Sequence, residues 1–287
     1  MSKIAYVNGR YVHHSSAYVH IEDRGFQFAD GVYEVISIFK KKFIDLDMHL
    51  DRLDRSLFEL KIPWPRSRRA FCVILKEIVQ KNRVTHGSVY LQITRGTSRR
   101  DFSFPKDLTP SLIVYARKTR PDSFDSVNRG FKVISQPDIR WKRCDIKTVS
   151  LLPAVLAKQA AVEEGAQEAW LVSEHGLVTE GTSSNAWIVS QNNELITRPI
   201  DNSILSGVTR KSVLNIVEKL GLIFVERAFS LDEAQDSKEA FLTSSTALVK
   251  PVVEIDGKKI GEGSAGPLTK QIIKNYFQYI ENSYETH

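Results

Sequence analysis

Residues 139–187 constrain the fold of this chain more than any other stretch. A polar, extended piece (139–150) leads into an apolar, Ala-rich helix at about 153–164, and two short strands with a turn between them follow. Lys147 lies in the extended piece, and Glu180 closes the second strand, 33 positions later (180 − 147). Neighbouring elements of an α/β fold can bring two such residues to one pocket. The stretch therefore predicts an α/β protein with Lys147 and Glu180 as candidate site residues.

Taken alone, these two residues are weak signals. Lys147 stands near Arg140, Lys142 and Arg143, and most lysines in such company are solvated, as most glutamates at strand ends are exposed. The run that follows Glu180, residues 181–185, strengthens the signal. Its small, hydrogen-bonding side chains make a poor core but a good lining for a polar, anionic ligand.

Length and composition narrow the class of protein. With 287 residues and 42% hydrophobic content, the chain can bury an ordinary core without metal or disulfide staples. Its two cysteines, Cys72 and Cys144, indicate a reducing compartment, and we find neither a signal peptide nor an apolar run near the roughly 18 residues that span a bilayer. We therefore expect a cytoplasmic protein without membrane contact. The net charge of +6 permits nucleic-acid binding but equally suits small anionic substrates.

Two local patterns define the N-terminal part. Asn8-Gly9, between short apolar runs, predicts a hairpin. His13 and His14 have no acidic or cysteine partner at the spacing of metal ligands, so we expect surface histidines and no metal site. Apolar residues then recur at helical spacing at 49–60, where Asp47 can cap the helix, and again at 67–81.

A polar segment with one proline, residues 119–123, is the candidate domain boundary. We therefore assign a small N-terminal α/β domain, an interdomain linker and a large C-terminal domain that carries Lys147, at residues 1–118, 119–125 and 126–287 respectively.

Several features suit an anionic ligand, although each is weak alone. Ser206-Gly207 opens a helix to about Leu220, and the free N–H groups of such a start form a natural phosphate seat. Arg52 lies off the buried stripe of its helix, where an arginine is either solvated or aimed at an anion. The basic loop 96–102 is either a solvated hairpin tip or a carboxylate clamp, because arginine binds carboxylates in a bidentate fork.

Seven blocks spread over nearly the whole chain form one pattern: EDRGFQFADGVYEV, HLDRL, ITRGTSRR, DIRWKRCDIK, VTEGTSSN, ILSGVTR and EIDGK. Together they resemble the class IV (fold type IV) pyridoxal-phosphate aminotransferases, and most of all the D-amino-acid aminotransferases of that family. One departure from the class signature is Trp187, where Phe or Tyr is usual. The resemblance implies a two-domain α/β (α+β) protein of fold type IV, pyridoxal 5′-phosphate as the cofactor, and an active site at the domain and dimer interface.

The resemblance also implies roles for individual residues. Lys147 looks like the lysine that forms the internal aldimine and then shuttles the proton, and Glu180 like the partner of the pyridine nitrogen. Tyr33 and Arg100 match the family's carboxylate trap. The positions that hold the phosphate or line the cofactor are Arg52, Ser183, Ser184, Leu205, Val208, Thr209, Ser244 and Ser245.

The implied reaction is transamination in two half-reactions with ping-pong kinetics. A carboxylate against the ring nitrogen keeps that nitrogen protonated, so the ring accepts the electrons left when the substrate Cα loses its proton. The expected substrates are small amino acids and 2-oxo acids. A D-amino acid such as D-alanine and 2-oxoglutarate would give a 2-oxo acid and D-glutamate.

Phe102 leaves more than one substrate class possible. It stands two residues beyond Arg100, where well-known D-amino-acid aminotransferases have a histidine, and a lost hydrogen bond costs on the order of 1–3 kcal/mol unless Arg99 replaces it. The alternatives within the family are a branched-chain aminotransferase, an (R)-amine transaminase and aminodeoxychorismate lyase. Because the family's loop reaches the neighbouring subunit, the resemblance implies a homodimer. A basic nucleic-acid-binding module is the remote alternative, since no stripe of aromatics interleaved with Lys and Arg occurs.

Overall fold

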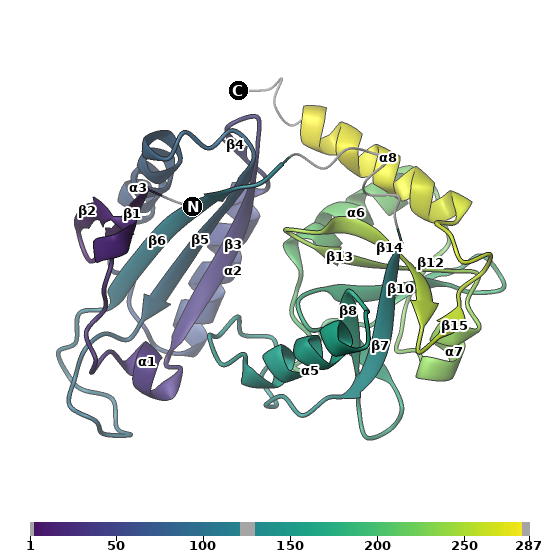
Figure 1. Ribbon diagram of the computed structural model, residues 1–287, viewed down its shortest axis with the longest axis horizontal. Coiled ribbons are helices and arrows are strands. Elements are labelled where there is room, and N and C mark those ends of the chain that lie inside the picture. The colour runs from purple at the N-terminus through teal and green to yellow at the C-terminus, as the bar shows by residue number, and fades with distance from the viewer. Residues whose placement is uncertain (1–2, 121–129, 283–287) are drawn as a thin grey trace. The chain divides into compact units, whose positions relative to one another are not determined.

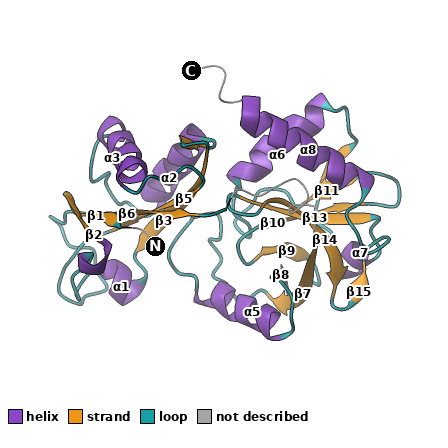
Figure 2. Cartoon of the chain, turned by 45° about the horizontal axis from the view of Figure 1, so that its top comes forward, coloured by secondary structure: helices purple, strands orange, loops and turns teal. Residues whose placement is uncertain are grey.

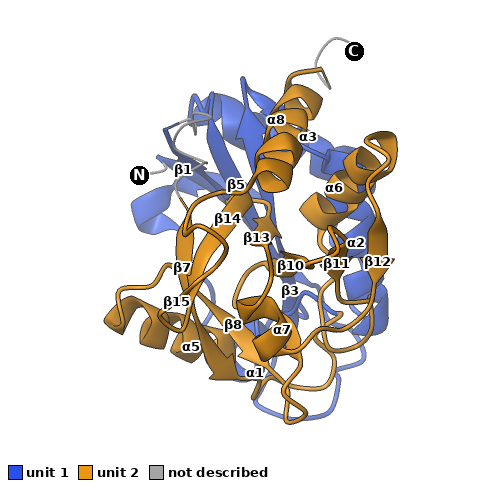
Figure 3. Cartoon of the chain, turned by 90° about the vertical axis from the view of Figure 1, so that its right-hand side faces the viewer, with its two compact units in different colours: residues 1–121, 146–150 blue, residues 122–145, 151–287 orange. Residues whose placement is uncertain are grey.

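The computed structural model describes residues 3–120 and 130–282 (Figure 1). The chain divides into two compact units, unit 1 with residues 1–121 and 146–150, and unit 2 with residues 122–145 and 151–287 (Figure 3). The predicted linker, residues 119–125, lies outside the described residues except for Thr119 and Arg120. We expected Lys147 in the C-terminal domain. Instead, its segment belongs to unit 1, because Tyr33 N donates to the Lys147 carbonyl at 3.0 Å and Val149 N donates to the Gly31 carbonyl at 3.1 Å.

Unit 1 is built on a six-stranded antiparallel sheet with the order β2-β1-β6-β5-β3-β4. The Asn8-Gly9 turn joins β1 and β2, as predicted. Helices α2 and α3 cover one face of the sheet (Figure 2). The elements of unit 1 are β1 (Ile4–Val7), β2 (Arg10–His13), a 3-10 turn (His14–Ser16), α1 (Arg24–Phe28), β3 (Gly31–Phe39), β4 (Lys42–Phe43), α2 (Leu46–Glu59), α3 (Arg68–Lys81), β5 (Gly87–Thr94) and β6 (Ser111–Lys118).

The two predicted helices of unit 1 are present, but one begins earlier than predicted. Ser67 caps α3, and its hydroxyl accepts a hydrogen bond from Ala70 N at 3.3 Å. Helix α2 begins at Leu46 after Asp45, which has a left-handed φ of 54°, so the prediction that Asp47 caps this helix is wrong. The apolar stripes of both helices form the core with the inner face of the sheet, through Leu50, Leu53, Leu57, Phe71, Ile74, Leu75 and Ile78.

Unit 2 contains a nine-stranded mixed sheet with the order β12-β11-β10-β13-β14-β7-β8-β9, and β15 pairs with β14. Strands β9 and β10 lie far apart in this order, yet only residues 182–184 connect them, so the sheet must curve back on itself. The strands are β7 (Phe131–Pro137), β8 (Glu168–Val172), β9 (Val178–Gly181), β10 (Asn185–Val189), β11 (Leu195–Thr197), β12 (Phe224–Glu226), β13 (Glu239–Ser244), β14 (Leu248–Ile255) and β15 (Lys258–Lys259).

Four described helices belong to unit 2: α5 (Leu152–Glu163), α6 (Val208–Lys219), α7 (Leu231–Gln235) and α8 (Pro267–Asn282). Helix α5 connects the parallel strands β7 and β8 and packs its alanines against them. The extended piece predicted at 139–150 is wrong, because these residues form bends and turns. Asp138 causes the first bend, since its carboxylate accepts a hydrogen bond from the backbone N–H of Arg140 at 3.2 Å.

No helix in the described part of the chain is long and apolar enough to cross a membrane. Cys72 and Cys144 are both free, in agreement with the absence of a predicted disulfide framework.

Candidate active site

Lys147 is fixed at the start of β3 in unit 1. Its backbone carbonyl pairs with Tyr33, and its backbone N–H donates to the Ser56 hydroxyl of α2 at 3.4 Å. Its side chain is half-buried, with Nζ 3.4 Å from the Tyr33 hydroxyl and 4.4 Å from the centroid of the Tyr33 ring. Unit 1 therefore brings together two of the predicted site residues and sets the direction of the amine.

A row of tyrosines continues from Tyr33 across the sheet. The rings of Tyr33 and Tyr90 stack with centroids 5.7 Å apart, and those of Tyr90 and Tyr115 with centroids 5.0 Å apart. Burial and the neighbouring phenols Tyr115 and Tyr33 raise the pKa of Tyr90, which keeps its hydroxyl neutral. The row was not predicted, although the alternation of β5 and β6 is the signal that puts Tyr90 and Tyr115 on one face.

Arg52 belongs to a buried cluster with Glu34 and His49. Its Nε and Nη2 donate to the two carboxylate oxygens of Glu34, each at 2.7 Å, and His49 Nδ1 lies 2.7 Å from the second oxygen. Burial alone would raise the pKa of Glu34, but the charge and hydrogen bonds of Arg52, with the hydrogen bond of His49, lower it to about 2. The carboxylate therefore stays ionised and holds the Arg52 guanidinium in one orientation.

Arg100 lies in the loop after β5, against the ring of Phe28, with its guanidinium carbon 4.7 Å from the ring centroid. Arg24 fixes this loop, because its Nη1 donates to the Asp101 carbonyl at 2.6 Å while its Nε donates to the Asp30 carboxylate at 2.8 Å. Phe102 is 84% exposed at the loop surface. The predicted carboxylate-binding arginine is thus on an ordered, outward-facing loop.

Glu180 is the centre of the candidate site in unit 2. Its carboxylate is buried and accepts hydrogen bonds from Arg140 Nη1, from Asn185 Nδ2 at 3.1 Å and from Leu205 N at 3.1 Å. Arg140 was not a predicted site residue, and its largely buried side chain pairs with both Glu180 and Asp138. Only the nearby Asp138 hints at this in the sequence, and such a spacing alone is not diagnostic.

The turn after Glu180 is organised by a buried acid that was also not predicted. Glu168 accepts hydrogen bonds from the hydroxyls of Thr182, of Ser183 at 3.2 Å and of Ser184 at 3.4 Å. Ser183 is exposed whereas Ser184 is buried. The hydroxyls of the two predicted serines are thus oriented from within unit 2.

The predicted phosphate seat is the start of α6. Gly207 is its N-cap and has no side chain to cap the helix, so the first N–H groups, at Val208 and Thr209, have no intrahelical acceptor. A Cβ on Gly207 would lie 2.0 Å from Asn185 Oδ1, which explains the glycine. Ser244 ends β13, and its hydroxyl accepts a hydrogen bond from Ala247 N at 3.0 Å, so Ser245 lies within a tight turn.

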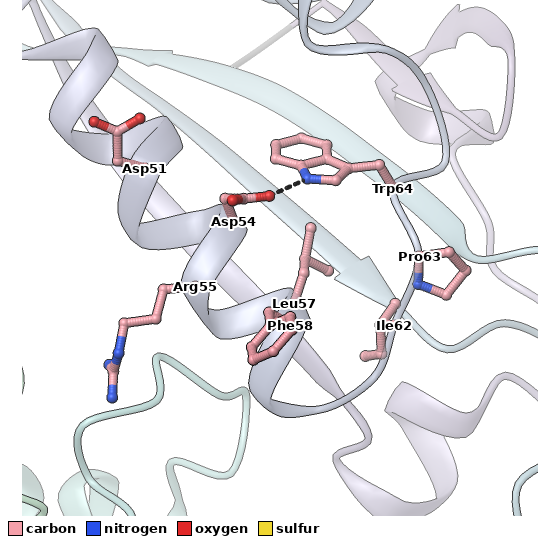
Figure 4. A pocket seen from close by; sticks show the side chains of 8 residues that line it. All are labelled: Asp51, Asp54, Arg55, Leu57, Phe58, Ile62, Pro63 and Trp64. Carbon is pink, nitrogen blue, oxygen red and sulfur yellow. Dashed lines mark hydrogen bonds between the residues drawn. The ribbon is translucent and has the colours of Figure 1, made fainter.

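Unit 1 also has a surface pocket of about 450 Å³ (Figure 4). Figure 4 shows Trp64 donating through its ring N–H to Asp54, at 2.7 Å. The other side chains that line the pocket are not predicted site residues either, and they are Asp51, Arg55, Leu57, Phe58, Ile62 and Pro63. We therefore give this pocket no part in the candidate site.

Comparison with known proteins decides the family. Residues 31–255 match the family described as Amino-transferase class IV. The chain belongs to the class IV aminotransferases. It is 44% identical to the D-alanine aminotransferase of Bacillus licheniformis over 265 residues, which cover 92% of this chain and 93% of that protein. It is 36% identical to the D-alanine aminotransferase of Staphylococcus aureus (strain N315) over 285 residues, 98% of this chain and 99% of that protein.

Solved structures confirm the fold of this class IV aminotransferase. The branched-chain amino acid aminotransferase of Escherichia coli matches with a TM-score of 0.89 at 22% identity, covering 97% of this chain and 94% of that one. That of Thermoproteus uzoniensis with norvaline matches with a TM-score of 0.87 at 23% identity, covering 99% and 97%. A third branched-chain enzyme, solved with pyridoxamine 5′-phosphate, matches with a TM-score of 0.90 at 24% identity, covering 98% and 94%. The predicted α/β fold of type IV is therefore confirmed.

The class IV aminotransferases are pyridoxal-phosphate enzymes, and the residues described above fit that cofactor. Unit 1 contains a half-buried amine at Lys147. Unit 2 by itself contains a buried carboxylate at Glu180 and a helix start at α6 whose first N–H groups have no intrahelical acceptor, which are groups of the kinds that such a cofactor requires. Trp187, the departure from the class signature, is buried, and its ring N–H donates to the Thr243 hydroxyl at 3.0 Å. The larger ring is thus accommodated in the core of unit 2. We find no cluster of metal-ligating side chains among the described residues.

Proposed function

We propose that this class IV aminotransferase transfers the amino group of small D-amino acids, such as D-alanine, to 2-oxoglutarate, with pyridoxal phosphate bound at Lys147. The observation that carries the proposal is the identity of 44% to a D-alanine aminotransferase across nearly the full length of both chains. Two free cysteines are consistent with action in the cytoplasm.

Bound at Lys147, pyridoxal phosphate supplies a reactive carbonyl carbon and a ring that accepts electrons. Lys147 Nζ removes the proton from the substrate Cα and later returns a proton, with the Tyr33 hydroxyl at 3.4 Å directing its approach. Glu180 holds a proton at the ring nitrogen. The N–H groups of Val208 and Thr209 bind the phosphate together with Arg52 and Ser245, and Ser183, Ser184, Leu205 and Ser244 line the ring.

Arg100 and Tyr33 bind the carboxylate of the substrate in this proposal. Phe102 cannot donate a hydrogen bond, so the trap has one donor fewer than in enzymes with a histidine there. We therefore expect weaker discrimination among substrates, expressed mainly as a higher KM. This same residue, with the fold match to branched-chain enzymes, favours a branched-chain aminotransferase as the second candidate.

A chiral activity assay tests the proposal. Purified protein with pyridoxal phosphate is given D-alanine, L-alanine or L-leucine with 2-oxoglutarate, and the glutamate formed is resolved by chiral chromatography. We expect D-glutamate from D-alanine, parallel lines in double-reciprocal plots, and no product from the Lys147→Ala variant. Turnover of L-leucine alone would contradict the D-amino-acid assignment and leave the branched-chain alternative.

We also propose that the enzyme is a homodimer, supported by an unusual face on α5. This helix turns its alanines toward the sheet and its large apolar side chains outward, with Leu152 68%, Val155 55% and Leu156 56% exposed. Monomers rarely leave such a stripe in water. The exposed Phe102 in the substrate loop adds a second apolar surface for a partner subunit.

The mass of the particle in solution tests the dimer. The parent is expected to have twice the chain mass by light scattering at micromolar concentration, and the double variant Leu152→Glu/Leu156→Glu the mass of one chain, because two charges cannot be buried unpaired. Gln159→Glu, a charge on an exposed residue of the same helix, is the matched control and should remain a dimer. A monomeric parent, or a dimeric double variant, would contradict this interface.

A further inference from the structure

We propose that Asp138 and Arg140 are positioning residues for Glu180, and that together the three side chains present one net negative charge to the ring nitrogen of the cofactor. The inference rests on the proposed role of Glu180. It assigns a function to an ion pair that the sequence did not single out.

The geometry fixes Arg140 between two carboxylates. Its Nε and Nη2 donate to the two oxygens of Asp138 at 2.9 and 2.8 Å, while Nη1 donates to Glu180. The Ser203 carbonyl accepts from Nη2 at 3.0 Å. Because the guanidinium is planar and held at every edge, the Glu180 carboxylate has one fixed donor direction.

Asp138 is anchored in turn. Its carboxylate accepts hydrogen bonds from the Thr179 hydroxyl at 2.7 Å and from Arg140 N at 3.2 Å. Burial would raise the pKa of Asp138, but the hydrogen bonds and charge of Arg140 lower it, so the carboxylate stays ionised. Thr179 immediately precedes Glu180 in β9, so one strand carries both the anchor of the pair and the acid that the pair positions.

The net charge of Asp138, Arg140 and Glu180 suits the binding of one protonated ring nitrogen. Arg140 separates the buried carboxylate of Glu180 from the half-buried carboxylate of Asp138, which would otherwise repel each other, and it neutralises one of the two charges. Cys144 is a titratable group that interacts with all three side chains, and burial raises the pKa of its thiol to about 11, so it is neutral at physiological pH. Asp145, also near Cys144, pairs with Arg143 at 3.0 Å. The remaining single negative charge equals the positive charge of one protonated ring nitrogen.

Two substitutions with opposite electrostatic sign separate this role from a merely structural one. Asp138→Asn removes a negative charge, so Arg140 cancels Glu180 and the ring nitrogen should lose its proton more easily. Arg140→Met removes the positive charge, so the ring nitrogen should hold its proton more firmly. A scaffold role alone would impair both variants in the same direction.

The ring nitrogen is followed in the holoenzyme by NMR with ¹⁵N-labelled pyridoxal phosphate over a pH titration. We expect its apparent pKa to fall by about one to three units in Asp138→Asn and to stay at or above the parent value in Arg140→Met. Arg227→Met, which removes another arginine–carboxylate pair of unit 2, that of Arg227 with Glu233, is the control and should not shift it. Shifts of the same sign in both variants, or none beyond the control, would overturn the proposal.

The apoprotein gives a second readout that does not depend on the cofactor. With ¹³C-labelled glutamate carboxyls, the pKa of Glu180 should rise in Arg140→Met and fall in Asp138→Asn. If the holoenzyme cannot be formed, the proposed function fails, whereas this titration still accepts or rejects the charge arrangement. Should Arg140→Met not fold, Arg140→Lys keeps the charge and loses the fork. It should keep the parent's ring-nitrogen pKa but bind the cofactor several-fold more weakly, and a shifted pKa would contradict the role of the charge.

Discussion

Each unit contains an arginine that is hydrogen-bonded to carboxylates, but the two arrangements hold different members of the pair in place. In unit 1 the fork of Arg52 closes on both oxygens of Glu34, which is fully buried. In unit 2 the fork of Arg140 closes on Asp138, and Glu180 receives only its third edge. Glu34 thus orients Arg52, whereas Arg140 orients Glu180.

The difference shows which member of each pair serves the ligand. A carboxylate with both oxygens saturated by one guanidinium has little left to offer a ligand, so in unit 1 the ligand-binding group is Arg52. Glu180 instead accepts hydrogen bonds from separate donors, which include Arg140 Nη1, Asn185 Nδ2 and Leu205 N. The exchange Glu→Gln should therefore damage stability in unit 1 and catalysis in unit 2.

Glu180→Gln against Glu34→Gln is the largest expected contrast. Glu180→Gln should lower kcat with D-alanine roughly 100-fold or more, since it removes the charge opposite the ring nitrogen, with little change in unfolding free energy. Glu34→Gln should cost about 3 kcal/mol of stability, because it removes the buried negative charge that pairs with the Arg52 guanidinium. Steady-state kinetics and urea unfolding measure the two. Equal losses of stability in both variants would break the comparison.

Lowering the pH should reduce the stability that the buried cluster of Glu34, Arg52 and His49 contributes. The folded pKa of Glu34, about 2, lies below its ordinary value of 4.5, so its stabilisation is fully present above pH 4.5 and is lost as the pH falls toward 2. That loss amounts to about 3 kcal/mol. Burial also lowers the pKa of His49, so below pH 6.5 the unfolded chain binds a proton that the folded chain does not, and stability falls further. Urea unfolding from pH 7 to 3 should show a steeper loss in the parent than in Glu34→Gln, and parallel curves would contradict this.

Arg52→Lys tests the fork with the charge retained. Lysine is a point donor and cannot span both oxygens of Glu34, so the cation should move relative to the phosphate. We expect the dissociation constant for pyridoxal phosphate to rise about tenfold, which corresponds to about 1.4 kcal/mol. Titration of the apoprotein by fluorescence measures it. Arg55→Lys, on the same helix, is the control and should leave the constant unchanged, and an unchanged constant in Arg52→Lys would remove Arg52 from the phosphate site.

Asn185→Ala is the smallest expected effect. It removes the hydrogen bonds that the neutral Asn185 amide donates to the Glu180 carboxylate, at 3.1 Å, and to the Leu205 carbonyl, at 3.0 Å, and leaves the charges in place. We expect a loss of kcat of roughly fivefold, which corresponds to about 1 kcal/mol. The pH dependence of kcat should keep its shape. A change in that shape would show that Asn185 controls the charge of Glu180 as well as its position.

Local pattern predicted much of this molecule. The helix at 68–81 follows from apolar periodicity, the helix at 152–163 from an apolar, Ala-rich run, and the N-terminal hairpin from Asn8-Gly9. The buried pairs could not be predicted from pattern. Arg140 and its partner Glu180 are separated by 40 positions in the sequence, and Arg52 and its partner Glu34 by 18. The partner of each arginine therefore depends on tertiary packing. The bends at 139–150 were missed because side-chain-to-backbone hydrogen bonds, such as that of Asp138, outweighed the extended pattern.

The attachment of the cofactor tests the central claim most directly. The holoprotein is reduced with borohydride, digested and examined by mass spectrometry, with Lys147→Arg and Lys142→Arg treated in parallel. We expect one pyridoxyl group, on the peptide at Lys147, in the parent and in Lys142→Arg, and none in Lys147→Arg. A pyridoxyl group on another lysine of the parent, or an equal yield from Lys147→Arg, would contradict the assignment of Lys147.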